Sequence, residues 1–110
     1  MGDLSFYETE PDKLLISSEA DVLRIFEKFY PKQKLILYQI NLSADFFDLS
    51  TGLAGQVLQK LVNYKVKTAF VIDLASVKSE KFREMVNEAN MGEQFRFFAR
   101  RGEAIEWLEN

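Results

Sequence analysis

Short apolar runs alternate along this chain with stretches whose apolar residues recur at helical spacing. Residues 35–38 and 69–72 are continuous apolar runs of the kind found in strands that are covered on both faces. The stretch 54–62 instead repeats its apolar residues at the period of a helix with one buried face. Strands joined through helices pair in parallel, with right-handed crossovers. The alternation therefore predicts an α/β fold.

The N-terminal part of the chain predicts two strands in succession. Residues 4–8 and 13–17 read as short strands, and Glu10-Pro11-Asp12 between them is typical of a turn. We expect these strands to form an antiparallel hairpin at one end of a small mixed sheet. Later strands are predicted at 35–38, 68–74 and 95–99, and helices are predicted to begin at Ser18, near Ser50, at Ser79 and at Glu103.

The predicted order is therefore β-β-α-β-α-β-α-β-α, in a single domain over residues 1–110. The first helix should turn one apolar stripe toward the sheet. Its members are Val22, Leu23, Phe26, Phe29 and Tyr30. Seven apolar residues are expected at the centre of the core: Leu37, Val57, Leu61, Phe70, Ile72, Val86 and Phe97.

Composition excludes several classes of function. The net charge of −3 and the pI near 5.0 argue against nucleic-acid binding, which needs a basic face. The chain has no Cys and no His, so it lacks a thiol nucleophile, the commonest general base and the commonest metal ligands. We therefore expect no cofactor, no metal and no free-standing catalytic activity.

The N-terminus carries neither a positively charged segment nor an apolar segment of the secretory type. No apolar run approaches the length of a membrane span. The expected location is the cytoplasm, without membrane contact.

The stretch FFDLSTGLAGQVLQKLVNY, residues 46–64, resembles the signature of a small bacterial family of unknown function. The segments NEANMG at 87–92 and EAIEWL at 103–108 resemble that family as well. The resemblance covers nearly the whole chain and implies no established activity.

A wider resemblance is to STAS domains, the fold of anti-sigma-factor antagonists. It rests on the order of elements and on residues 47–53, which are similar to the Asp-Ser-Ser/Thr-Gly-Leu motif at the start of a STAS helix. The resemblance implies a regulatory module that a kinase phosphorylates at Thr51, with Ser50 before it. The chain departs from the motif in one respect: Leu49 precedes the hydroxyl pair, and Asp48 lies one residue earlier.

The residues around this motif support two interpretations. A helix N-terminus offers unpaired N–H groups and a positive dipole end, so Asp48, Ser50, Thr51, Gly52 and Gly55 could form an anion site or a protein-contact surface. Alternatively, a hydroxyl only caps the helix and the glycines only permit close packing. The glycine spacing is that of neither a P-loop nor a Rossmann fingerprint.

Three secondary candidates are Asp73, which follows the central strand, and Asn87 and Asn90, near the end of the third helix. Three functions remain open: a regulatory protein-interaction module, a small-ligand or nucleotide-binding domain, and an enzyme using Asp48, Ser50 or Thr51, and Asp73. The expected partner of the first is an unidentified protein such as a kinase or regulator, and a second copy of the chain is the alternative.

Overall fold

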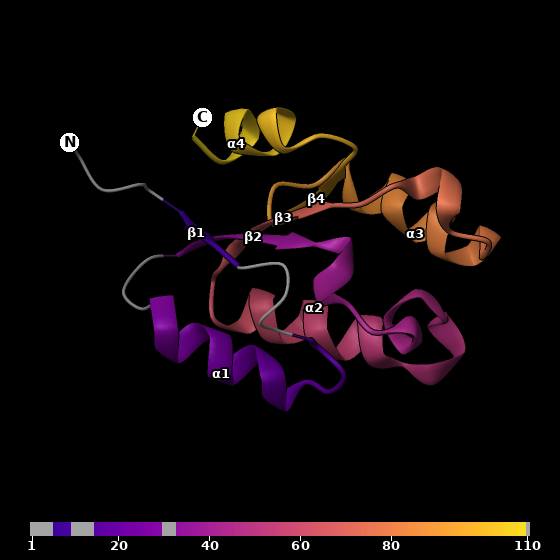
Figure 1. The fold of residues 1–110 in the computed structure, drawn as a ribbon, viewed down its shortest axis with the longest axis horizontal. Coiled ribbons are helices and arrows are strands. Elements are labelled where there is room, and N and C mark those ends of the chain that lie inside the picture. The colour runs from indigo at the N-terminus through magenta and orange to yellow at the C-terminus, as the bar shows by residue number, and fades with distance from the viewer. Residues whose placement is uncertain (1–5, 10–14, 30–32, 110) are drawn as a thin grey trace.

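The protein folds as an α/β sandwich of three layers (Figure 1). The structure is a computed structural model that describes residues 6–9, 15–29 and 33–109. Its elements are β1 (Tyr7–Glu8), α1 (Ala20–Phe29), β2 (Lys34–Tyr38), α2 (Leu53–Asn63), β3 (Lys67–Val71), α3 (Glu80–Ala89), β4 (Phe95–Phe98) and α4 (Arg101–Glu109). The predicted α/β class is confirmed.

The described strands form one parallel sheet in the order β1-β2-β3-β4. Each crossover moves one strand further in the same direction, so right-handed connections place α1, α2 and α3 on the same face. Apolar residues of these helices share one core cluster, whereas α4 packs with a second cluster on the opposite face (Figure 1). All seven residues predicted at the centre of the core are buried.

Aromatic rings fill the larger core cluster. The rings of Phe70 on β3 and Phe97 on β4 stack with centroids 4.6 Å apart. Phe46 comes from the connection between β2 and α2. Its ring centroid lies 5.8 Å from that of Phe70 and 5.9 Å from that of Phe82 of α3. Offset and edge-to-face pairs of this kind add to the stability that burial provides. They join the connection after β2 to the sheet and to α3.

The predicted antiparallel hairpin and mixed sheet are wrong for the described strands. β1 pairs in parallel with β2, with Tyr7 opposite Leu35. Of the second predicted strand, residues 13 and 14 lie outside the described residues, and Ile16 forms an isolated parallel bridge with Leu42. Two segments therefore pair along the same side of β2. β1 pairs with the strand itself, and Ile16 pairs with Leu42, just after the turn that follows the strand.

The inward stripe of α1 also differs in part from the prediction. Val22 is buried as expected, and Phe26 is half-buried and stacks on Tyr64 at the end of α2. Leu23 is 39% exposed, and Ile25 is buried in its place. The predicted Phe29 and Tyr30 side chains lie outside the described residues.

Asn90 closes the outer edge of β4. Its side-chain amide donates to the Phe97 carbonyl oxygen at 3.2 Å and accepts from the Phe97 N–H at 2.8 Å. The neighbouring residues of β4 bond to β3, so these two groups of Phe97 face away from the sheet. The amide thus takes the place of a further strand and blocks edge-to-edge pairing.

We predict that Asn90→Ala lowers the free energy of unfolding by about 1–2 kcal/mol, because Phe97 loses two hydrogen bonds. The opened edge should also cause concentration-dependent self-association. Urea unfolding and sedimentation velocity measure the two effects. Asn87→Ala, an exposed position on the same helix, is the control. Equal stability and equal sedimentation of the two variants would contradict this role.

An ion pair joins the two ends of the chain on the α4 face. Arg101 donates to both carboxylate oxygens of Glu8, at 2.6 and 2.9 Å, and the Tyr38 hydroxyl donates to the same carboxylate. The hydrogen bonds from Arg101 are the main reason that the pKa of Glu8 is lowered. The pKa of Tyr38 is raised to about 12, mainly by burial and secondly by the Glu8 carboxylate. The Tyr38 hydroxyl therefore stays protonated at neutral pH. The cluster fixes β1 and α4 at the end of β2.

The lowered pKa of Glu8 predicts a pH-dependent contribution to stability. The contribution is present above the unfolded-state value of about 4.3 and is lost as the pH falls through the lower folded-state value. Glu8→Gln should therefore be less stable than the wild type at pH 7, and the difference should shrink in acid. Urea unfolding at pH 7 and at a pH below the folded-state pKa of Glu8 measures the difference in stability. The exposed Glu103→Gln is the control. A difference that is the same at both pH values would contradict the ion pair.

Candidate functional site

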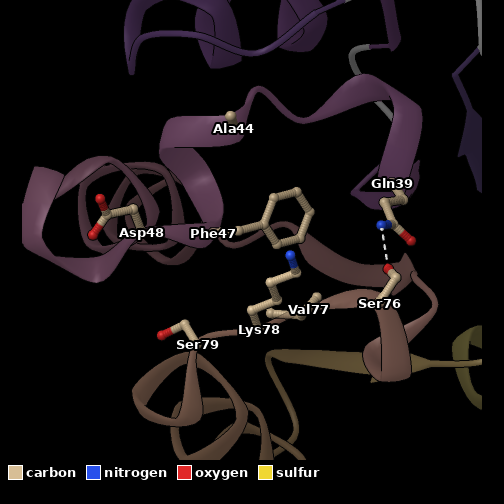
Figure 2. Close-up of a pocket in the computed structure, with 8 residues that line it drawn as sticks. All are labelled: Gln39, Ala44, Phe47, Asp48, Ser76, Val77, Lys78 and Ser79. Atoms are coloured by element: carbon tan, nitrogen blue, oxygen red, sulfur yellow. Dashed lines mark hydrogen bonds between the residues drawn. The ribbon is translucent and has the colours of Figure 1, made fainter.

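A hollow of about 350 Å³ opens at the carboxyl ends of β2 and β3 (Figure 2). This is the edge of a parallel sheet at which α/β proteins generally bind ligands. The hollow is shallow and open to solvent. It is lined by Gln39, Ala44, Phe47, Asp48, Ser76, Val77, Lys78 and Ser79.

Gln39 connects the two strand ends beside this hollow. Its Oε1 accepts from the Asp73 N–H at 2.7 Å, and its Nε2 donates to Ser76 Oγ at 2.9 Å (Figure 2). Ser76 Oγ donates in turn to the Asp73 carbonyl oxygen. The Asp73 carboxylate accepts from the Ala75 N–H at 3.1 Å, so Asp73 holds the turn after β3. Asp73 does not belong to the lining of the hollow.

Asp48, Ser50 and Thr51 precede α2 in an exposed loop that hydrogen bonds to itself. The Asp48 carboxylate accepts from the Ser50 N–H at 3.0 Å and from Ser50 Oγ at 2.6 Å. These hydrogen bonds lower the pKa of Asp48, with the Ser50 hydroxyl as the largest cause. Asp48, Ser50, Thr51 and Gly52 are exposed. Their conformation is therefore set by polar contacts within the loop.

Thr51 makes more internal contacts than Ser50 does. Its Oγ1 lies 2.7 Å from the Asp45 carbonyl oxygen and 2.9 Å from that of Asp48, and it accepts from the Leu53 N–H at 3.2 Å. Gly52 follows with φ of +79°, a left-handed conformation that favours glycine. The predicted helix start near Ser50 is therefore early by one short turn, since residues Leu49–Thr51 form a 3₁₀ turn and α2 begins at Leu53.

Residues 48–52 form a ridge between two hollows, called here the 48–52 ridge. Asp48 lines the first hollow, and Gly52 lines a second, open hollow of about 510 Å³ over the outer face of α2. Gly55 also lines the second hollow, and a Cβ placed on it would meet no atom within 4 Å. The structure thus brings Asp48, Ser50, Thr51, Gly52 and Gly55 onto one surface.

The two sides of the first hollow carry opposite charges. Asp48 lies on one side and Lys78 lies on the other. Figure 2 shows the Lys78 ammonium group directed toward the ring of Phe47. Ser79 Oγ caps α3 by accepting from the Phe82 N–H at 3.1 Å, as predicted. Such a surface can form ion pairs and hydrogen bonds with a partner. Within the described ranges, Asp48 supplies the carboxylate that contacts one of its hydroxyls, that of Ser50.

Sequence reasoning missed Gln39, Ser76 and Lys78. Their signal was available, because each follows a predicted strand closely and the carboxyl ends of parallel strands share one edge. Asn87 and Asn90 lie elsewhere: Asn87 is exposed on α3, and Asn90 closes the edge of β4.

Two further searches of the described residues give negative findings. No three His, Cys, Asp or Glu side chains in this part of the chain come together as a metal site would require. None of the helices in the described ranges combines the length and apolar character needed to cross a membrane.

Comparison with known proteins gives one match. A family model described as a domain of unknown function (DUF4180) matches residues 2–108. Neither the curated proteins nor the solved structures contain a significant match to the chain. The match agrees with the expectation of a family of unknown function.

The unequal contacts of the two hydroxyls give a testable difference. We predict that Thr51→Val lowers the free energy of unfolding by about 1–2 kcal/mol, because the loop loses a donor to two carbonyls and the cap on Leu53. Ser50→Ala should cost much less, since Asp48 keeps the Ser50 N–H. Chemical unfolding of both variants measures the difference. A larger loss for Ser50→Ala would show that this account of the loop is wrong.

Proposed function

The chain belongs to the DUF4180 family of unknown function, and we propose that it is a non-enzymatic protein-interaction module that presents the 48–52 ridge to a protein partner. The observation that carries this proposal is the combination of exposure and internal order in the ridge. Four of its five residues are exposed and Leu49 is half-buried, and Asp48 and Thr51 hold its backbone through their own hydrogen bonds. A loop ordered before binding loses little conformational entropy on contact.

The shape of the surrounding surface also favours a protein partner. A small ligand is usually enclosed on most sides, whereas both hollows beside the ridge are open. The ridge would insert into a groove of the partner, and the partner's side chains would enter the two hollows. Lys78 and Asp48 would supply charged contacts on one side. Glu19 and Lys60 would supply them on the other, together with the side-chain amides of α2.

Regulation by phosphorylation fits the same surface. The STAS resemblance implies Thr51 as the acceptor, and the Thr51 hydroxyl group donates to carbonyl oxygens that hold the ridge. Transfer of a phosphoryl group to Oγ1 removes that donor and places negative charge beside these carbonyls and Asp48. The ridge would therefore lose its order, and partner binding would weaken.

A small-ligand-binding domain is the second candidate function. It is favoured by the Lys78 ammonium group and the polar side chains of Gln39, Ser76 and Ser79 around the first hollow, whose volume lies at the lower end of ligand pockets. The enzyme alternative has less support, because Asp73 holds a turn outside this hollow.

Gly55→Arg tests the protein-interaction function. The site has room for a side chain, and replacing glycine within a helix stabilises it by up to about 1 kcal/mol. We predict that the variant folds and melts no lower than the wild type but fails to retain the partner in affinity capture from the native cell. Gly102→Arg is the matched control, because Gly102 is also an open helical position and lies on α4, on the opposite face of the sheet.

Two outcomes would contradict the proposal. One is that Gly55→Arg retains the same proteins as the wild type, and the other is that both arginine variants lose them equally. Native mass spectrometry of the captured protein separates the second candidate function: a bound small molecule that is lost in Lys78→Gln would support ligand binding in the first hollow.

A further inference from the structure

Basic residues converge at the end of the sheet opposite the 48–52 ridge. Lys34 begins β2, Lys67 begins β3, and the two are partners in the strand register. Arg96 of β4 is the partner of Ala69, which shares a sheet face with Lys67 because alternate residues of a strand point the same way. All three cations therefore lie on the face that α4 covers, at the amino ends of the strands.

Trp107 completes this group, which we call the amino-edge cluster: Lys34, Lys67, Arg96 and Trp107. Helix α4 runs back over the sheet, so its C-terminal end lies near the amino ends of the strands (Figure 1). Lys67 Nζ lies 4.5 Å from the centroid of the Trp107 ring, and Arg96 Cζ lies 5.4 Å from it. The indole therefore holds two cations within the range of cation–π attraction.

Two of the three cations contact protein groups. Lys67 Nζ donates to the Trp107 carbonyl oxygen at 3.0 Å, where a cation suits the C-terminus of a helix. Arg96 forms an ion pair with Glu93 at 2.7 Å, and its Nε donates to the Gly92 carbonyl oxygen at 2.7 Å. Lys34 adds a further positive charge directly opposite Lys67, and like charges in that position destabilise a sheet. Three cations therefore lie close together at the amino ends of the strands.

Electrostatics and burial both favour an anion beside this cluster. The pKa of Lys67 is lowered, first by burial and then by Lys34, with Arg96 acting in the same direction against Glu93. The buried Trp107 Nε1–H has no hydrogen-bond partner among the described residues. Buried donors without partners are rare in native proteins, and a bound water or ion is one explanation of such a donor.

The space beside the cluster limits the size of that anion. A hollow of about 180 Å³ adjoins it and is lined by Val62, Lys65, Val66, Lys67, Glu93 and Gln94. This volume is below the usual range for drug-sized ligands, so the hollow suits a single small group. Lys67 belongs both to its lining and to the cluster.

We propose that the amino-edge cluster binds an oxyanion of the phosphate type, either free phosphate or the phosphoryl group of a small molecule. Arg96 and Lys67 would donate charge-assisted hydrogen bonds to its oxygens, and Lys34 would supply the remaining charge. The site is independent of the 48–52 ridge, because the two lie at opposite edges of the sheet.

Trp107 is the single tryptophan of the chain and reports on this site directly. The experiment titrates the ¹⁵N-labelled protein with inorganic phosphate, and separately with phosphoserine, at an ionic strength held constant with sodium chloride. We expect a saturable shift of the Trp107 indole N–H resonance and a matching change in tryptophan fluorescence. A response to phosphate alone assigns the site to the free ion, and a response to both assigns it to phosphoryl groups in general.

Charge-neutral variants provide the specificity control. Lys34→Gln should weaken the apparent affinity about tenfold, a loss of about 1.4 kcal/mol. Lys81→Gln, an exposed lysine of α3, should titrate like the wild type. The proposal is overturned if phosphate shifts the indole resonance no more than chloride does, or if Lys34→Gln and Lys81→Gln titrate alike.

Discussion

The candidate site depends on the burial of Phe46. This ring is fully enclosed and lies against Phe70 of the sheet and Phe82 of α3. Burying a phenylalanine side chain contributes about 1.5–3 kcal/mol, a large part of a typical domain stability of about 5–15 kcal/mol. Because Phe46 comes two residues before Asp48, its burial fixes the base of the 48–52 ridge and one wall of the first hollow together.

Apolar patterns were sufficient to predict most of the fold, and polar contacts between distant residues were not predictable. The strands predicted at 35–38 and 95–99 are found at Lys34–Tyr38 and Phe95–Phe98, and the buried face of α2 followed from hydrophobic periodicity. The hairpin prediction was wrong because the direction of pairing depends on which strand edge is open. β1 pairs in parallel with the edge of β2. The bond between Glu8 and Arg101 spans 93 positions of sequence and leaves no local pattern. At the site, the sequence motif predicted the 48–52 ridge. It did not predict Gln39 and Lys78, which line the first hollow with Asp48 but follow the ends of β2 and β3.

The parallel sheet gives the molecule two chemically different edges. At the carboxyl edge, hydroxyls, amides and opposite charges surround open hollows, which suits reversible contact with another protein. At the amino edge, Lys67 and Arg96 lie against one indole ring, and Lys34 is the strand partner of Lys67. A net charge of −3 for the whole chain hides this separation, because strand pairing places residues that are distant in sequence side by side. A regulatory module could use one edge for its partner and the other for a small anion.

The central claim is that the 48–52 ridge contacts a protein partner. Its most direct test is to replace Ser50 with a photoreactive amino acid, irradiate the native cells and identify the crosslinked protein by mass spectrometry. The control carries the same amino acid at the exposed Glu106 on α4, across the sheet from the ridge. A single discrete adduct formed from position 50 and absent from position 106 is the predicted result. No adduct from position 50, or the same adducts from both positions, would contradict the account.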